Sequence, residues 1–127
     1  DTDRSRGLGD VYKRQALHAI AGGYDGYLRW AVNSWTADPL RDSRFRTWAA
    51  GDTYSIYPGP RSSIRFERLV EGLQDAEKIR ILREELKGSK LDKLNKTVAM
   101  FTPEGLAETQ KSATEMVNEL NKVLNSF

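Results

Sequence analysis

Gly23-Tyr-Asp-Gly-Tyr-Leu-Arg-Trp-Ala-Val-Asn-Ser-Trp35 decides the fold, together with Gly51-Asp-Thr-Tyr-Ser-Ile-Tyr-Pro-Gly-Pro60. Aromatic and β-branched residues recur in both stretches, and glycine, aspartate or proline stands at their ends. This pattern predicts strands over 26–33 and 52–57. Strands with apolar residues on both faces belong to sheets that are covered on both sides. Because two strands do not make an independently stable sheet, the sequence predicts the closing part of a larger α/β structure.

A long helix is expected after the second strand, starting at a cap formed by Ser62 or Ser63 and running to about Leu86. Its apolar residues recur every three or four positions, so one face is buried. That face consists of Phe66, Leu69, Val70, Leu73, Ala76, Ile79, Leu82 and Leu86.

Shorter helices are expected on both sides of this block. Residues 16–21 are typical of the last turns of a helix, which Gly22-Gly23 would end. A short amphipathic helix is expected over 91–101. Thr102-Pro103 opens a last helix, with the hydroxyl as cap and proline at the first position, and its apolar face continues to Phe127.

The composition excludes several classes of protein. The 20 basic and 18 acidic residues are mixed along the chain and give a net charge of +2, so no basic surface for nucleic acid is expected. No apolar run approaches the ~20 residues of a membrane span. With no cysteine and one histidine, the chain has neither disulfides nor a multi-histidine metal site. No phosphate loop or zinc-ligand spacing occurs, so no metal and no cofactor is expected.

The first fifteen residues differ from the rest. They are polar and show no periodicity, which favours a disordered arm. Ser5-Arg-Gly-Leu-Gly-Asp-Val-Tyr-Lys-Arg-Gln15 also resembles, residue for residue, a sequencing adapter translated in frame. We therefore expect three parts: a non-native disordered segment at 1–15, the end of a barrel domain at 16–87 and a helical tail at 88–127. On this interpretation, natural sequence upstream of Ala16 is missing.

Candidate binding residues lie at the strand ends. Along the first strand Leu28, Trp30 and Val32 form one set, suited to packing under helices, while Arg29 and Asn33 belong to the other. In a parallel barrel the second set faces the interior, and the C-terminal ends of the strands line the active face. Asn33, Trp35 and Tyr57 would then lie at the mouth, with Arg29 below them. An indole stacks on the C–H face of a sugar, and Asn or Tyr hydrogen-bonds its hydroxyl or acetamido groups.

Structural roles compete with these functional ones. Trp30 is expected in the core and Trp48 as a packed loop anchor, because large aromatic residues mostly serve packing. Arg65 could recognise an anion, although an ion pair that fixes the helix is favoured. Three aspartates are candidates for acid–base chemistry, but no spacing pairs them: Asp38, Asp42 and Asp52. His18 receives no role.

Residues 23–83 resemble the C-terminal part of a bacterial domain family, domain of unknown function 4091, which is related to family 123 glycoside hydrolases. The matching motifs are Gly-Tyr-Asp-Gly-Tyr-Leu-Arg-Trp-Ala-Val-Asn-Ser-Trp, Asp-Pro-Leu-Arg-Asp-Ser-Arg-Phe-Arg, Gly-Asp-Thr-Tyr-Ser-Ile-Tyr-Pro-Gly and Ser-Ile-Arg-Phe-Glu-Arg-Leu. Four unlike motifs in the right order make the resemblance specific. One departure is Ala76, where members of the family often have an aromatic residue.

The resemblance implies the last two strands of a (β/α)8 TIM-like barrel and a parent enzyme that hydrolyses β-N-acetylhexosaminides, such as N-acetylgalactosaminides. It also implies substrate-assisted catalysis by an adjacent Asp-Glu pair, and export to the periplasm or the cell exterior. No Asp-Glu dipeptide occurs in this chain, so no catalytic residue is assigned and the chain itself is expected to be inactive.

Three functions remain open at this stage. The chain is a fragment of a glycosidase whose partner is an N-acetylhexosamine-containing glycan, or it belongs to a non-catalytic carbohydrate-binding or structural barrel protein. The third possibility is a free-standing helical adaptor domain, for which residues 16–127 would fold cooperatively alone. An upstream Asp-Glu pair would support the enzyme. The oligomeric state stays open.

Overall fold

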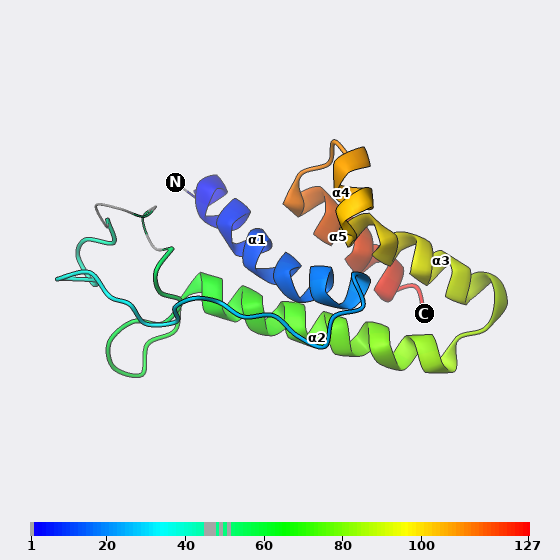
Figure 1. Ribbon diagram of the computed structural model, residues 1–127, viewed down its shortest axis with the longest axis horizontal. Helices are drawn as coiled ribbons and strands as arrows, with labels where there is room; N and C mark the ends of the chain where they lie inside the picture. Colours follow the sequence, from blue (N-terminus) through cyan, green and yellow to red (C-terminus); the bar gives the residue numbers. More distant parts are fainter. Residues whose placement is uncertain (1, 45–47, 49, 51) are drawn as a thin grey trace.

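The structure is a computed structural model that describes residues 2–44, 48, 50 and 52–127, with only the backbone described for 2–8. The described residues are mostly helical. The two longest helices, α1 and α2, lie side by side, and the chain between them extends beyond the N-terminal end of α2 (Figure 1). The elements are α1 (Thr2–Ala21), α2 (Ile64–Glu85), α3 (Gly88–Val98), the 3-10 helix η1 (Ala99–Phe101), α4 (Pro103–Glu108) and α5 (Ala113–Leu124).

Helix α1 ends as the glycine pair predicts. Gly23 adopts a φ of +71°, a left-handed conformation that glycine reaches without a Cβ clash. The N–H of Tyr24 donates to Ala19 O at 2.9 Å, and the N–H of Gly23 donates to Ile20 O at 3.3 Å. This is the hydrogen-bond pattern of a Schellman motif, which satisfies the last carbonyls of the helix.

The beginning of α1 differs from the expected disorder. The backbone is helical from Thr2 onward, and Asp10, Tyr12 and Lys13 of the adapter-like stretch have partners elsewhere in the fold. Asp10 accepts a hydrogen bond from Thr114 Oγ1 of α5 at 2.6 Å. The Lys13 ammonium lies 2.9 Å from a carboxylate oxygen of Asp75 in α2. Residues 2–15 are therefore helical and contact the other helices through Asp10 and Lys13, whereas their origin in an adapter and the division into three parts stay predictions.

The long helix is confirmed with the cap that the sequence indicates. Ser63 is the N-cap, and its Oγ accepts a hydrogen bond from the N–H of Phe66 at 3.2 Å. Helix α2 then runs to Glu85, and the backbone becomes extended at Leu86. Helix α2 contacts α1, and Ile79 of the expected apolar face is fully buried, whereas Leu73 of the same face is 50% exposed.

The single last helix that the apolar pattern predicts is divided in two. Thr102 caps α4 as expected, accepting from the N–H of Gly105 at 3.1 Å, but α4 ends at Glu108. A new helix starts after Ser112, whose side chain accepts from the N–H of Glu115 while the Glu115 carboxylate accepts from the N–H of Ser112. This reciprocal capping box favours a helix start at Ser112 over continuation of α4.

The hydrophobic core lies among the helices. It draws on α1, α2, α3, η1 and α5, so residues on both sides of the expected domain boundary at 87/88 share one core. Its buried members are Leu17, Ile79, Leu94, Val98, Phe101, Met116, Val117, Leu120 and Leu124.

The two expected barrel strands do not form in the described residues. The only pairing there is by isolated antiparallel bridges, Asn33 with Tyr54 and Tyr57 with Arg61. In a barrel, the segments that contain Asn33 and Tyr54 would run parallel, but here they are antiparallel. The fold is therefore corrected to a mainly helical one with an irregular excursion between α1 and α2. The physical reason is that each segment has only the other to pair with, and an isolated pair is marginal in water.

Helices α1 and α2 approach closely at Gly72. This glycine is buried, and a Cβ atom at its position would lie 2.2 Å from the carbonyl oxygen of Lys13 and 3.0 Å from its Cα. The backbones can therefore meet only because Gly72 has no side chain. The Lys13 side chain continues along α2, where its ammonium reaches Asp75.

His18 joins α1 to η1, a role that the sequence does not reveal. Its Nδ1 lies 2.6 Å from Phe101 O, and its ring meets the Phe101 ring edge-on at 6.0 Å between centroids. Burial is the main cause that lowers the pKa of His18 below 6.5; the nearby Arg14 charge lowers the pKa further, while the hydrogen bond to Phe101 raises it. The folded state thus favours the neutral ring.

We predict that acidification destabilises the fold through His18. Because the pKa is lower in the folded state, the unfolded chain binds the proton more readily, and stability is lost as the pH falls below 6.5. Melting temperatures measured at a series of pH values should decline in that window for the wild type and much less for His18→Asn. Carboxylates such as Glu77, whose pKa is lowered from 4.5, affect the melting temperature only at more acidic pH. An equal decline in both proteins would exclude His18 as the cause.

Candidate functional site

Residues 32–34 and 53–56 meet in one antiparallel contact. The N–H of Ser34 donates to Thr53 O at 3.1 Å, and the N–H of Ser55 donates to Val32 O at 2.8 Å. The Thr53 hydroxyl adds a hydrogen bond to Ser34 O at 2.6 Å. Asn33 consequently lies opposite Tyr54. The predicted site residues are thus gathered by this contact rather than by two parallel strand ends.

Trp35 is held in place by its own ring nitrogen. Its Nε1–H donates to Ile56 O at 2.8 Å, across the contact between the two segments. The side chain nevertheless remains 40% exposed. A ring that is fixed at its polar edge and open on part of its surface is suited to stacking against a flat ligand.

Tyr57 lies beside a buried tyrosine. Its ring meets the Tyr54 ring edge-on, with 5.3 Å between centroids, and its backbone pairs with Arg61 across the predicted Pro58–Pro60 turn. Gly59 in that turn has a φ of +75°. Tyr54 is fully buried, and burial is the main cause that raises its pKa, to which Tyr57 adds. Tyr54 therefore stays a neutral phenol that supports Tyr57.

Arg29 connects three parts of the chain. Its Nη2 donates to the Tyr12 hydroxyl at 2.9 Å and to Asp52 O at 2.7 Å, and it lies 3.3 Å from the Asp52 carboxylate. The guanidinium also stacks over the Tyr12 ring at 4.9 Å. These contacts tie α1 to both paired segments. The sequence could not indicate them, because the partners lie 17 and 23 residues away.

Arg65 anchors the start of α2 to the same region. Its Nε and Nη2 both donate to Tyr54 O, at 3.2 and 2.9 Å, and its guanidinium lies 5.4 Å from the centroid of the Tyr54 ring. Among the described residues, Arg65 thus hydrogen-bonds to the backbone carbonyl of Tyr54 in place of the predicted ion pair. The anchoring role holds, with a different partner.

The three candidate aspartates are engaged with arginines. Asp42 accepts from the Arg44 side chain at 2.8 Å through both carboxylate oxygens, and hydrogen bonds from Arg44 lower the Asp42 pKa to about 2. Asp38 lies 3.8 Å from Arg41, and Asp52 pairs with Arg29. Because its pKa is lowered, Asp42 is unsuited to protonating a leaving group at neutral pH. Within the described residues no cluster of three His, Cys, Asp or Glu side chains could hold a metal ion.

The apolar set of the first expected strand is exposed. Leu28 is 95% exposed and Val32 is 47% exposed, so neither side chain is covered by the described helices. Trp30 and Trp48, which we expected in the core and as a packed anchor, are also largely exposed and lie against each other. The expectation of packing under helices is wrong for Leu28, Trp30 and Val32, and Trp48, expected as a packed loop anchor, is 48% exposed and packs against Trp30.

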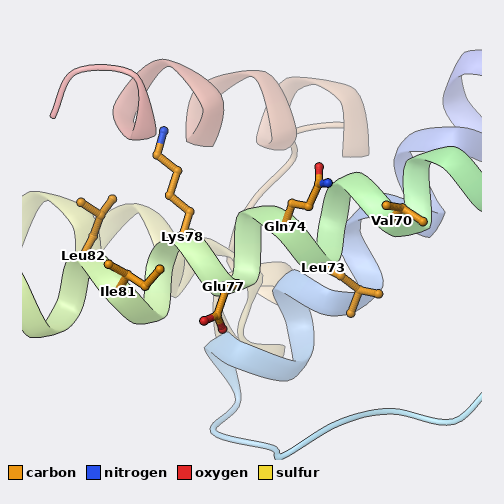
Figure 2. Close-up of a pocket in the computed structure, with 7 residues that line it drawn as sticks. All are labelled: Val70, Leu73, Gln74, Glu77, Lys78, Ile81 and Leu82. Carbon is orange, nitrogen blue, oxygen red and sulfur yellow. The ribbon is translucent and has the colours of Figure 1, made fainter.

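A shallow groove lies elsewhere, on the outer side of α2. Figure 2 shows its lining side chains, with Leu73 and Glu77 on one side of the helix and Gln74 and Lys78 on the other. None of the predicted binding residues lines it. In the described part of the chain, no helix is both long and apolar enough to cross a membrane.

Comparison with known proteins identifies the family. Residues 12–82 match the family described as Glycoside hydrolase 123, catalytic domain, which is more than half of the 127 residues. No curated protein matches the chain. The matched range begins at Tyr12, one of the partners of Arg29, and contains every candidate binding residue together with most of α2. It confirms the relation to glycoside hydrolases and implies a carbohydrate as substrate. The chain belongs to the glycoside hydrolase 123 catalytic-domain family.

Proposed function

We propose that this chain supplies one wall of the substrate pocket in an enzyme that hydrolyses β-N-acetylhexosaminides of the N-acetylgalactosaminide type. The observation that carries the proposal is Trp35: it lies within the family match, its Nε1–H is fixed by Ile56 O, and its ring is 40% exposed. Such an indole offers its negative π face to the weakly positive C–H groups of a sugar ring.

Asn33 and Tyr57 supply the polar contacts in this proposal. Asn33 lies in the same short segment as Trp35, and Tyr57 directly follows Ile56, the residue that holds the indole. Their amide and phenol groups can donate to and accept from sugar hydroxyls or an acetamido group. Arg29 stays a candidate contact, and its bonds to Tyr12 and Asp52 also make it the residue that holds this wall to α1.

The proposal assigns the catalytic groups of the reaction to residues outside these 127, on the family resemblance. In substrate-assisted hydrolysis the acetamido oxygen attacks the anomeric carbon while one carboxylate orients the acetamido group and another protonates the leaving oxygen. The family resemblance places an adjacent Asp-Glu pair in these roles, and this chain contains no such dipeptide. A carbohydrate-binding relative without hydrolysis fits the same observation, and an Asp-Glu pair in the upstream gene would decide between them. Export from the cell is part of the proposal on the resemblance alone.

Trp35→Ala is predicted to weaken binding of N-acetylgalactosamine by about ten-fold, the loss expected when one stacking contact is removed. Titration followed by saturation-transfer NMR measures this on the full chain. The matched control is Leu40→Ala, which removes another exposed apolar side chain from the same segment and should leave the affinity unchanged. Wild-type protein is expected to bind without releasing nitrophenol from a nitrophenyl N-acetyl-β-galactosaminide. Turnover by this chain alone would contradict the placement of the catalytic pair.

A further inference from the structure

Trp30 and Trp48 form an exposed aromatic pair to which nothing above assigns a role. Trp30 is 57% exposed and Trp48 is 48% exposed. Their ring centroids lie 5.5 Å apart, and the ring planes are inclined by 42°. Each indole therefore restrains the other, while about half of each side chain faces solvent. The pair presents angled aromatic surfaces rather than one flat ring.

Packing does not account for this pair. Neither tryptophan belongs to the hydrophobic core, which lies among the helices and is built from other residues. An indole can bury ~150–250 Å² of surface, so leaving half of it in water forgoes hydrophobic stabilisation. Single exposed apolar residues are ordinary on protein surfaces, but a contiguous pair of the largest aromatic side chains is typical of a binding surface.

The chemistry of the surface selects the ligand. Two indoles offer electron-rich faces and no charge, which suits the C–H face of a pyranose ring better than an anionic group. Arg29, which precedes Trp30 in the sequence, is already engaged by Tyr12 and Asp52. In a family whose substrates are carbohydrates, a sugar residue is the occupant that this surface fits.

We propose that Trp30 and Trp48 form a second sugar platform, which binds a residue of the glycan other than the one stacked on Trp35. The inference rests on the proposed function and extends it. Among the described residues, the Trp35 ring takes part in neither the Trp30–Trp48 contact nor any other aromatic pair, and it is held instead by Ile56 O. Two separately held aromatic surfaces in the excursion between α1 and α2 would make the chain selective for glycans longer than one sugar.

The test compares two probes on the full chain: N-acetylgalactosamine and a β-linked N-acetylgalactosamine tetrasaccharide. Wild-type protein should bind the tetrasaccharide at least about ten-fold more tightly than the monosaccharide. Trp30→Ala and Trp48→Ala should each weaken tetrasaccharide binding by about ten-fold, the scale of one lost aromatic contact. Binding of the monosaccharide should not change. Trp30→Phe, which keeps a π face, should retain most of the affinity.

Leu28→Ala is the matched control, since Leu28 is 95% exposed, apolar and two positions before Trp30. It should bind both probes like the wild type, and circular dichroism should show unchanged helices in all variants. Equal tetrasaccharide affinity in the wild type and in the tryptophan variants overturns the platform alone, and so does an equal loss in Leu28→Ala. Wild-type protein that binds only the monosaccharide, through Trp35, also overturns the platform but supports the proposed function. Protein that binds neither probe overturns both proposals.

Discussion

Gly72→Ala is expected to lower the free energy of unfolding by about 3 kcal/mol, at the upper end of the usual cost of overpacking. The added methyl group would lie 2.2 Å from Lys13 O, a backbone atom that moves only if the whole of α1 shifts. Such a shift would also disturb the contact between Lys13 and Asp75. Urea denaturation followed by far-ultraviolet circular dichroism measures the loss as a lower transition midpoint.

Gly26→Ala is the matched control for this substitution. No atom lies within 4 Å of a Cβ built at Gly26, so the same chemical change meets no neighbour there. The free energy of unfolding should change by less than about 1 kcal/mol, which is the scale of the effect on the unfolded chain. Equal losses in the two variants would mean that α1 and α2 do not meet closely at Gly72.

Leu120→Ala is expected to cost about 2 to 5 kcal/mol, the range for removing a buried leucine side chain from a packed core. Leu120 in α5 is fully buried, and its core neighbours come from α1, α2, α3 and η1. A small domain is stable by only ~5–15 kcal/mol, so the variant should unfold at a much lower temperature or lose its cooperative transition. Thermal unfolding followed by circular dichroism measures the effect.

Leu28→Ala makes the same change at a side chain that is 95% exposed, and it should leave the melting temperature unchanged. The pair of variants also tests the free-standing helical interpretation of the chain. A cooperative transition in the wild type that Leu120→Ala alone weakens would show that the helices form an independent core. A wild-type chain without any cooperative transition would instead favour the barrel-fragment interpretation.

Helix ends were predictable because their causes are local. Ser63 caps α2, Thr102 caps α4, and Gly23 ends α1, each through atoms within a few residues. The strands were not predictable from the same kind of evidence, since a strand forms only when another segment pairs along it. The break before Ser112 was missed because the apolar spacing continues through it, while the capping box depends on two side chains.

The candidate site was predictable to a smaller extent. The order of the motifs indicated that Asn33, Trp35 and Tyr57 would lie in one region, and the contact between 32–34 and 53–56 brings their segments together. The partners of Arg29 could not be foreseen, because they depend on where α1 lies. The exposure of Trp30 was also unforeseen: an apolar residue in an alternating pattern predicts burial only if an element covers it.

The excursion between α1 and α2 is held by the buried Tyr54, by bonds from Arg65 of α2 to the Tyr54 carbonyl and by the Arg29 junction with Tyr12 of α1. The helices keep their buried apolar residues in a separate cluster. The proposed recognition site and the hydrophobic core therefore lie in two different regions of one chain. If the tryptophans bind glycan as proposed, their substitution would change glycan selectivity with little effect on the free energy of the helical core, and this surface could diverge while the scaffold stays the same.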